Sequence, residues 1–236
     1  MTRAPARKSS SSQTLREAIK DAAWKQISEA GAAALSLRAI GRKLKITAPA
    51  IYNYFHRRDD LVTALIVDAY AEFGDSQRAA VATVDPADHA GRIRALGHAY
   101  RRWAVANPER YQLIFGAPYP GYRVPGDAVG PVASRALAVL VGVLEQARLA
   151  GVLRAEPPAA PLDVSAQPRS LPQDRVAELY GSADPEVLHA AVSIWTRVHG
   201  PVAIELSRQY PPFVTDPERV YGLEMEAMVR SAITGG

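Results

Sequence analysis

The sequence has no cysteine, which excludes disulfide bonds, thiolate chemistry and cysteine-based metal sites and is compatible with a reducing cytoplasm. It also has no run of about 18 or more apolar residues, so we expect neither a transmembrane helix nor a membrane partner. The basic, serine-rich start "MTRAPARKSSSSQ" is not followed by an apolar stretch. We therefore expect no secretory signal, a disordered basic arm over residues 1–12 and a cytoplasmic location.

Catalytic motifs are missing as well. The sequence contains no H-E-x-x-H, G-x-S-x-G or P-loop motif. No paired spacing relates the five histidines, which are His56, His89, His98, His189 and His199. We therefore expect a protein that is not an enzyme and that holds no metal and no cofactor. A helical enzyme and a helical adaptor without nucleic acid are the alternatives from other functional classes.

Positive charge is concentrated near the N-terminus, although the net charge of the whole chain is only +4. Residues 1–60 contain 12 Lys and Arg against 5 Asp and Glu, whereas residues 61–236 contain 16 against 19. The bias survives without the basic arm, because residues 13–60 still carry a net charge of +4. A basic end on a mildly acidic body indicates a surface that meets a polyanion such as nucleic acid.

Helical periodicity dominates the chain, and no convincing alternating strand occurs, so the sequence predicts an all-α fold. In the first helix, residues 14–31, Thr14 and Glu17 can form a capping box, and Gly31 fits a C-terminal stop. We expect about nine helices, the others over residues 36–44, 48–55, 58–78, 89–107, 109–115, 132–151, 184–207 and 216–233. Irregular structure is expected over the Gly- and Pro-rich segments 116–131 and 152–172, and Gly200-Pro201 must kink or interrupt its helix.

Two short helices, Ser36–Leu44 and Ala48–Phe55, have the spacing of a helix-turn-helix, in which the second helix lies in the major groove of DNA. Pro49 is compatible with this arrangement. With Thr47 as N-cap it occupies the second helical position, where a backbone N–H has no intrahelical partner. Residues 45–55 contain one Lys and no Arg, so we expect short side chains of the second helix to read bases while phosphate contacts elsewhere supply affinity.

Residues 36–66, "SLRAIGRKLKITAPAIYNYFHRRDDLVTALI", resemble the DNA-binding signature of the TetR family of bacterial transcription regulators. The resemblance rests on Ala39, Ile46, Thr47, Tyr52, Tyr54, Phe55, Arg58 and Leu61. Lys45 differs, because that turn position is usually glycine and a left-handed lysine there costs about 1 kcal/mol. Arg58 stands where the family usually has lysine. The resemblance implies a DNA-binding domain over residues 13–60 with three helices and the helix-turn-helix, joined to a larger helical ligand-binding and dimerisation domain over residues 61–236.

The resemblance also implies roles for single residues. Ser36 would cap its helix and touch a phosphate, while Tyr52, Tyr54 and Arg58 would bind phosphates; Tyr54 could instead be partly core. The residues expected to face bases or the nearby sugar-phosphate are Thr47, Ala48, Pro49, Ala50 and Asn53. Asn53 is the best candidate for base readout, since an amide can pair with N6 and N7 of adenine.

In the second half of the chain, "WTRVHG" (195–200) resembles the Trp-x-x-x-His-Gly signature of one TetR C-terminal domain type. Trp195 and His199 are four residues apart and so share a helix face, either in a ligand pocket or as a core fixture beside Gly200-Pro201. Nearby aromatic residues could line the same cavity or belong to the core. The expected ligand-binding residues are Tyr100, Trp103, Tyr111, Phe115, Trp195 and His199, with Tyr119 as a further member of the aromatic group.

The helices over residues 184–207 and 216–233 are the expected surfaces of a homodimer, with Met225 and Met228 at the contact. Two identical reading heads would then meet a palindromic operator in double-stranded DNA. We expect a repressor that releases this operator when an unknown small-molecule effector binds, with the fourth helix (58–78) transmitting the change. An activator and a regulator without a ligand are the alternatives of the same fold.

Overall fold

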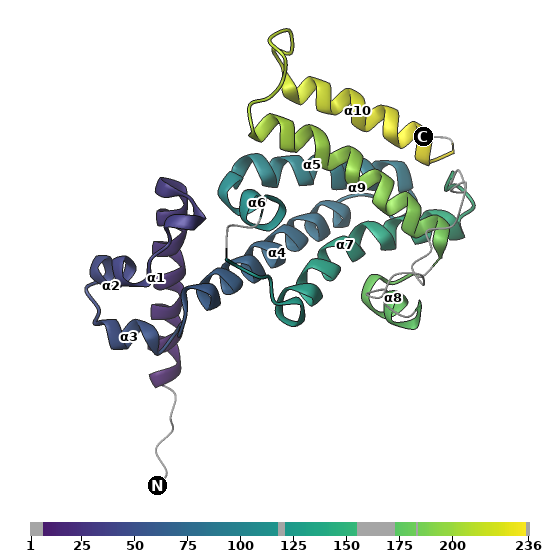
Figure 1. Cartoon of the computed structure of the whole chain (residues 1–236). Coiled ribbons are helices and arrows are strands. Elements are labelled where there is room, and N and C mark those ends of the chain that lie inside the picture. Colours follow the sequence, from purple (N-terminus) through teal and green to yellow (C-terminus); the bar gives the residue numbers. More distant parts are fainter. Residues whose placement is uncertain (1–6, 118–120, 155–172, 183, 235–236) are drawn as a thin grey trace. The chain divides into compact units, whose positions relative to one another are not determined.

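The computed structural model describes residues 7–117, 121–154, 173–182 and 184–234, and those parts of the chain are helical as the sequence predicts (Figure 1). They contain ten α-helices, one short 3-10 helix and one isolated antiparallel bridge between Leu153 and Ile233. The chain divides into two compact units. Unit 1 comprises the described parts of residues 1–69 and 109–129, and unit 2 those of residues 70–108 and 130–236. The functional boundary expected at residue 60 remains a prediction.

Unit 1 contains the N-terminal helices, which Figure 1 shows grouped with the beginning of α4. Its elements are α1 (Arg7–Ala30), η1 (Ala32–Ala34), α2 (Leu37–Leu44), α3 (Ala48–Tyr52), the first part of α4 (Arg58–Ala82) and α6 (Pro108–Phe115). Every one of the four α-helices up to α4 contributes buried apolar side chains to one core, among them Ile19, Ile27, Ile40, Ile51, Leu61 and Leu65. Burial of each such side chain stabilises the unit by about 1.5–3 kcal/mol.

An ion pair ties α1 to α4 within this unit. The ammonium of Lys20 lies 2.7 Å from a carboxylate oxygen of Asp68 and 2.9 Å from one of Glu17. Burial lowers the pKa of Lys20, but the two carboxylates outweigh that effect and the pKa ends above its usual value. Lys20 therefore stays charged, and this cation is engaged by the protein's own carboxylates.

Unit 2 contains the remaining helices, and its centre is the packing of α5, α9 and α10, which lie side by side in Figure 1. Its elements are the second part of α4, α5 (His89–Ala106), α7 (Gly126–Leu149), α8 (Gln173–Tyr180), α9 (Pro185–Leu206) and α10 (Pro217–Ala232). The guanidinium of Arg101 on α5 makes two hydrogen bonds, of 2.9 and 2.7 Å, to the carboxylate of Glu205 on α9. It also lies 3.3 Å from Glu218 on α10, so one side chain links all three helices.

Gly97 allows α10 to approach α5 closely. A β-carbon at this position would lie 2.3 Å from Cε of Met225, and the hydroxyl of Tyr221 donates to the Gly97 carbonyl. Met225 and Met228 are each 2% exposed, so both belong to the core of unit 2. The expectation that they form a dimer contact is therefore wrong for the side chains as this structure places them.

Several predicted helix boundaries differ from the structure. α1 begins at Arg7, because no Gly or Pro interrupts the helix between that residue and Thr14. Residues 7–12 of the expected disordered arm are therefore helical, and residues 1–6 lie outside the described residues. α7 begins at Gly126 and continues through Pro131, although an internal proline removes one backbone hydrogen bond and its ring crowds the carbonyl four residues earlier, at a cost of about 3 kcal/mol. α9 likewise runs uninterrupted through Pro201. No helix was expected at α8, which has eight residues and follows the segment 155–172, itself outside the described residues.

Within the described residues, α7 is long and apolar enough to cross a membrane by length and composition, and 39% of its apolar window is buried. Arg135 and Ser134 lie within this helix, and Val141 and Leu144 are fully buried against the rest of unit 2. Apolar core helices commonly pass the same criterion, so the composition of α7 alone is weak evidence for a membrane.

The left-handed conformation of Lys45 (φ 55°, ψ 37°) at the end of α2 leads to the first testable prediction. Lys45→Gly should raise the free energy of unfolding by about 1 kcal/mol, because glycine adopts this conformation without the steric penalty of a side chain. Urea denaturation followed by circular dichroism measures the change.

Lys43→Gly is the matched control, since Lys43 is an exposed lysine two residues earlier inside α2. There glycine should lower the free energy of unfolding by about 0.5–1 kcal/mol. Equal destabilisation by both substitutions would contradict the left-handed assignment of residue 45.

Candidate nucleic-acid interface

Ser36 fixes the beginning of α2 and connects it to α1. Its side-chain oxygen accepts a hydrogen bond from the backbone N–H of Ala39 at 3.4 Å, which confirms the predicted cap. Its own backbone N–H donates to the side-chain carbonyl of Gln26 on α1 at 3.0 Å. The bond to Gln26 therefore ties the capped start of α2 to α1.

The turn that follows α2 is closed by backbone hydrogen bonds on either side of the left-handed residue. The N–H of Lys45 donates to the carbonyl of Arg42 at 3.2 Å, and the N–H of Ile46 donates to the carbonyl of Gly41 at 3.0 Å. This pattern satisfies carbonyls at the helix end that would otherwise lack partners. The tight turn leaves only two residues between α2 and the cap of α3.

Thr47 caps α3 as predicted, and its hydroxyl accepts from the backbone N–H of Ala50 at 3.4 Å. Ala48 begins the helix and Pro49 lies in its first turn, where no intrahelical N–H bond is lost. The helix ends at Tyr52, three residues earlier than expected, because the chain then turns to bury Phe55, which is only 2% exposed. Ala48–Tyr52 is thus a five-residue helix held at both ends.

The predicted DNA-contacting residues differ in exposure. Tyr52 is 37% exposed, and Thr47, Pro49 and Asn53 are exposed as well. Ser36, Ala50 and Tyr54 are half-buried. The structure therefore brings the exposed members together on the short segment 47–53, while their contacts with DNA remain predictions.

Two arginines that could have bound phosphate are engaged inside unit 1. The guanidinium of Arg16 lies over the ring of Phe55, 4.5 Å from its centroid, and also donates to the carbonyl of Tyr54 at 3.4 Å. Nη2 of Arg58 donates to the carbonyls of Ala32 and Ala33 at 2.9 and 3.1 Å. Arg58 therefore braces the 3-10 turn between α1 and α2, and the phosphate contact expected of it remains a prediction beside this structural role.

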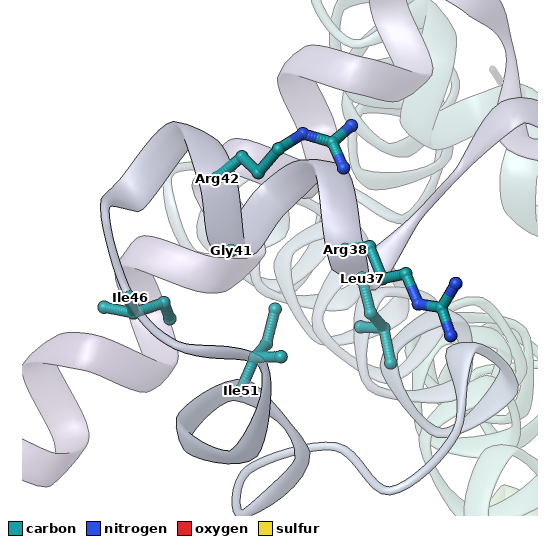
Figure 2. Close-up of a pocket in the computed structure, with 6 residues that line it drawn as sticks. All are labelled: Leu37, Arg38, Gly41, Arg42, Ile46 and Ile51. Carbon is teal, nitrogen blue, oxygen red and sulfur yellow. The ribbon is translucent and has the colours of Figure 1, made fainter.

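A hollow of about 240 Å³ lies between α2, the turn and α3, as Figure 2 shows. Its lining residues are Leu37, Arg38, Gly41, Arg42, Ile46 and Ile51. In Figure 2 both arginine side chains extend from α2 toward the right of the view, Arg42 upward and Arg38 downward. Sequence reasoning did not assign Arg38 and Arg42, although two arginines four residues apart on the helix before the turn would have been a usable signal.

The aromatic residues expected around a ligand are divided between the two units. In unit 2 the hydroxyl of Tyr100 lies 2.7 Å from Nδ1 of His199, and Phe73 packs edge-on against Tyr100 and Trp103 at 5.2 and 5.1 Å. Burial lowers the pKa of His199 below its usual value, so the ring is neutral near pH 7. The indole N–H of Trp103 is buried and has no hydrogen-bond partner within the described ranges.

The other predicted members lie elsewhere or point outward. Tyr111 and Phe115 contact each other on α6 in unit 1, with ring centroids 5.1 Å apart, and Tyr119 lies outside the described residues. Trp195 stacks beside His199 at 5.3 Å but is 37% exposed, so its expected inward position is wrong. A single cavity lined by all of these residues remains a prediction.

Both parts of the chain match known protein families. Residues 19–65 match the family described as "Bacterial regulatory proteins, tetR family", and residues 93–228 match "Tetracyclin repressor-like, C-terminal domain". The chain is 34% identical to the HTH-type transcriptional regulator Rv1816 of Mycobacterium tuberculosis over 207 residues, which is 87% of this chain and 86% of the relative. The HTH-type transcriptional regulator Mb1846 of Mycobacterium bovis matches equally well.

Solved structures agree with these matches. The regulatory protein SCO4313 superposes with a TM-score of 0.72 and 36% identity, over 92% of this chain and 95% of that protein. The TetR family transcriptional regulator PfmR from Thermus thermophilus superposes with a TM-score of 0.57 over 90% of this chain and 97% of its own. Its identity to this chain is only 15%, so this second match shows the fold alone.

The role of Arg58 as a brace is testable by comparison with its neighbour. Arg58→Ala should lower the free energy of unfolding by about 1–3 kcal/mol, because it removes charge-assisted hydrogen bonds to two carbonyls. Thermal or urea unfolding measures this loss.

Arg57→Ala removes the same charge one residue earlier, from an exposed side chain without a hydrogen bond or ion pair to the described part of the protein. It should change the free energy of unfolding by less than about 0.5 kcal/mol. Equal losses for Arg57→Ala and Arg58→Ala would show that the two carbonyl bonds contribute nothing specific.

Proposed function

We propose that this chain, which belongs to the TetR family of bacterial transcription regulators, is a ligand-responsive repressor that binds a palindromic operator as a homodimer. As a member of this family it is an HTH-type, DNA-binding regulator and not an enzyme. The proposal goes beyond family membership in five respects: repression, the response to a ligand, the homodimer, the palindromic operator and a location in the cytoplasm. An activator or a regulator without a ligand would share the same fold.

One observation carries the DNA-binding part of this proposal. The segment 47–53 presents Thr47, Pro49, Tyr52 and Asn53 to solvent, while Ile51 between them is fully buried. A short helix with polar and small residues outside and one apolar anchor inside suits the major groove, which admits a helix and is read at its base edges. Tyr52 would donate its hydroxyl to a phosphate, and Asn53 would pair with an adenine.

The effector site is proposed near Tyr100, Trp103 and His199 in unit 2. His199 is neutral near pH 7 and bonded to Tyr100, and the buried indole N–H of Trp103 can still donate one hydrogen bond. Such a donor among apolar rings favours an uncharged or aromatic effector with a hydrogen-bond acceptor. The assignment of "WTRVHG" to the Trp-x-x-x-His-Gly domain type belongs to this proposal too.

Helix α4 is the proposed route from the effector to the DNA. Its residue Asp68 pairs with Lys20 of α1 in unit 1, and Phe73, five positions later, packs on Tyr100 and Trp103 in unit 2. Five helical residues span about 7.5 Å. A shift of α4 caused by the effector would therefore move α1 as well. The effector would reduce the population of the DNA-competent state to the extent that it binds the other state more tightly.

Exposed apolar side chains on α9 and α10 support the homodimer. Val192 and Trp195 on α9 are 46% and 37% exposed, and Leu223 on α10 is 64% exposed. Val192 and Trp195 are three residues apart and share one face of their helix. Two copies that bury these helices against each other would form a four-helix bundle related by a two-fold axis. These side chains replace Met225 and Met228 as the proposed contact.

DNA binding is tested by a mobility-shift assay on the intergenic DNA upstream of the protein's own gene. Tyr52→Phe should weaken binding about three- to tenfold on every sequence, because one hydrogen bond to a phosphate is lost. Asn53→Ala should instead relax the preference at one base position by about 1–3 kcal/mol. If neither substitution alters binding, the docking of α3 in the groove is wrong.

The dimer is tested by sedimentation or light scattering of the full-length protein. Leu223→Glu should shift the protein towards the monomer, since it places a charge in an apolar contact. Leu149→Glu is the matched control, because Leu149 on α7 is 70% exposed and lies outside α9 and α10. A dimer that survives Leu223→Glu, or that is lost equally with Leu149→Glu, speaks against this interface.

A further inference from the structure

The cations of the N-terminal helices whose side chains the structure describes fall into two groups, those that the protein itself engages and those that it leaves to solvent. Arg16, Lys20 and Arg58 are engaged by an aromatic ring, two carboxylates and two carbonyls, as described above, and Lys25 lies 4.0 Å from Glu29. The exposed cations whose side chains make no hydrogen bond or ion pair with described residues are Arg38, Arg42, Lys43, Lys45 and Arg57. This second group lies on the elements that precede and follow α3 in the chain, namely α2, its C-terminal turn and the residue before α4.

Arg38 and Arg42 differ from the other exposed cations in their relation to each other. They are four residues apart on α2 and so lie on one face of that helix, and both line the hollow of Figure 2. The remaining lining residues are the apolar Leu37, Ile46 and Ile51 and the backbone of Gly41, and none of the lining residues is acidic. Two guanidinium groups at this spacing repel each other, and an anion between or beside them removes that repulsion.

The segment between this pair and α4 explains which anion is expected. Residues 46–56, "ITAPAIYNYFH", contain no Lys or Arg, so α3 cannot neutralise the phosphates that flank the groove it enters. Phosphate neutralisation supplies most of the sequence-independent affinity of a DNA-binding protein. The cations must therefore come from neighbouring elements, and Arg58 is already engaged with two carbonyls.

We propose that Arg38 and Arg42 form a phosphate clamp that holds the DNA backbone beside α3 while α3 reads the bases. The clamp rests on the DNA-binding function proposed above and adds two residues to it. Arginine suits the task because its planar guanidinium binds phosphate through two parallel hydrogen bonds. Four helical residues rise about 6 Å, which places the two groups close enough to bind one strand at neighbouring phosphates.

The test measures binding of the full-length protein to two duplexes, the upstream DNA and an unrelated sequence, across a range of salt concentrations. Arg38→Ala and Arg42→Ala should each make the slope of log K against log salt shallower by about 1 on both duplexes, and the double variant by about 2. Arg38→Lys and Arg42→Lys should keep the slope, since lysine still neutralises a phosphate. Circular dichroism confirms that each variant is folded.

Lys43→Ala is the matched control, because it removes one positive charge from the same helix about 100° around the axis from Arg42. It should leave the slope unchanged. A double variant with the slope of the unsubstituted protein overturns the clamp, as does a Lys43→Ala effect equal to that of Arg42→Ala.

The remaining outcomes separate the clamp from the proposed function. Loss of preference for the upstream DNA with an unchanged slope would mean that the arginines read bases, which also overturns a phosphate clamp. If the unsubstituted protein binds both duplexes equally, the proposed operator is wrong, yet the slopes on the unrelated duplex still decide the clamp. Absence of salt-dependent binding to either duplex would overturn both proposals.

Discussion

A helix of five residues is too short to be stable in water, so α3 depends entirely on what surrounds it. Ile51 and Phe55 anchor it from below, being 0% and 2% exposed, and each contributes about 1.5–3 kcal/mol through burial. The cap from Thr47 and the left-handed turn at Lys45 fix where it begins. These few contacts position every exposed residue of the segment 47–53. DNA binding through α3 therefore requires an intact core of unit 1.

The same unit separates structural cations from cations that are available to a ligand. Lys20 connects α1 to α4, and Arg58 braces the 3-10 turn, so both side chains stabilise the fold of unit 1. Arg38 and Arg42 are left exposed beside the hollow. In the proposed complex, phosphate neutralisation and base readout fall to different helices, so that α3 would present small side chains and an amide to the groove without carrying charge itself.

Periodicity and caps predicted the helices of the head well, since Ser36 and Thr47 are local signals that tertiary packing does not override. Boundaries without such signals were predicted poorly. α7 and α9 continue through Pro131 and Pro201, because the burial of a long helix outweighs the roughly 3 kcal/mol that an internal proline costs. Contacts distant in sequence, such as Arg16 with Phe55 or Gly97 with Met225, were not predictable, because no local pattern encodes which side chain a given arginine or glycine will meet. The exposure of Trp195 and the burial of Met225 were missed for the same reason.

The central claim is that two copies of this head bind one symmetric stretch of DNA through α3. A hydroxyl-radical footprint of the full-length protein on the DNA upstream of its own gene tests it most directly. The account predicts one protected segment made of two halves related by a two-fold axis, with centres about 10 base pairs or a multiple of that apart. A single unsymmetric protected patch, or uniform protection along the whole fragment, would contradict it.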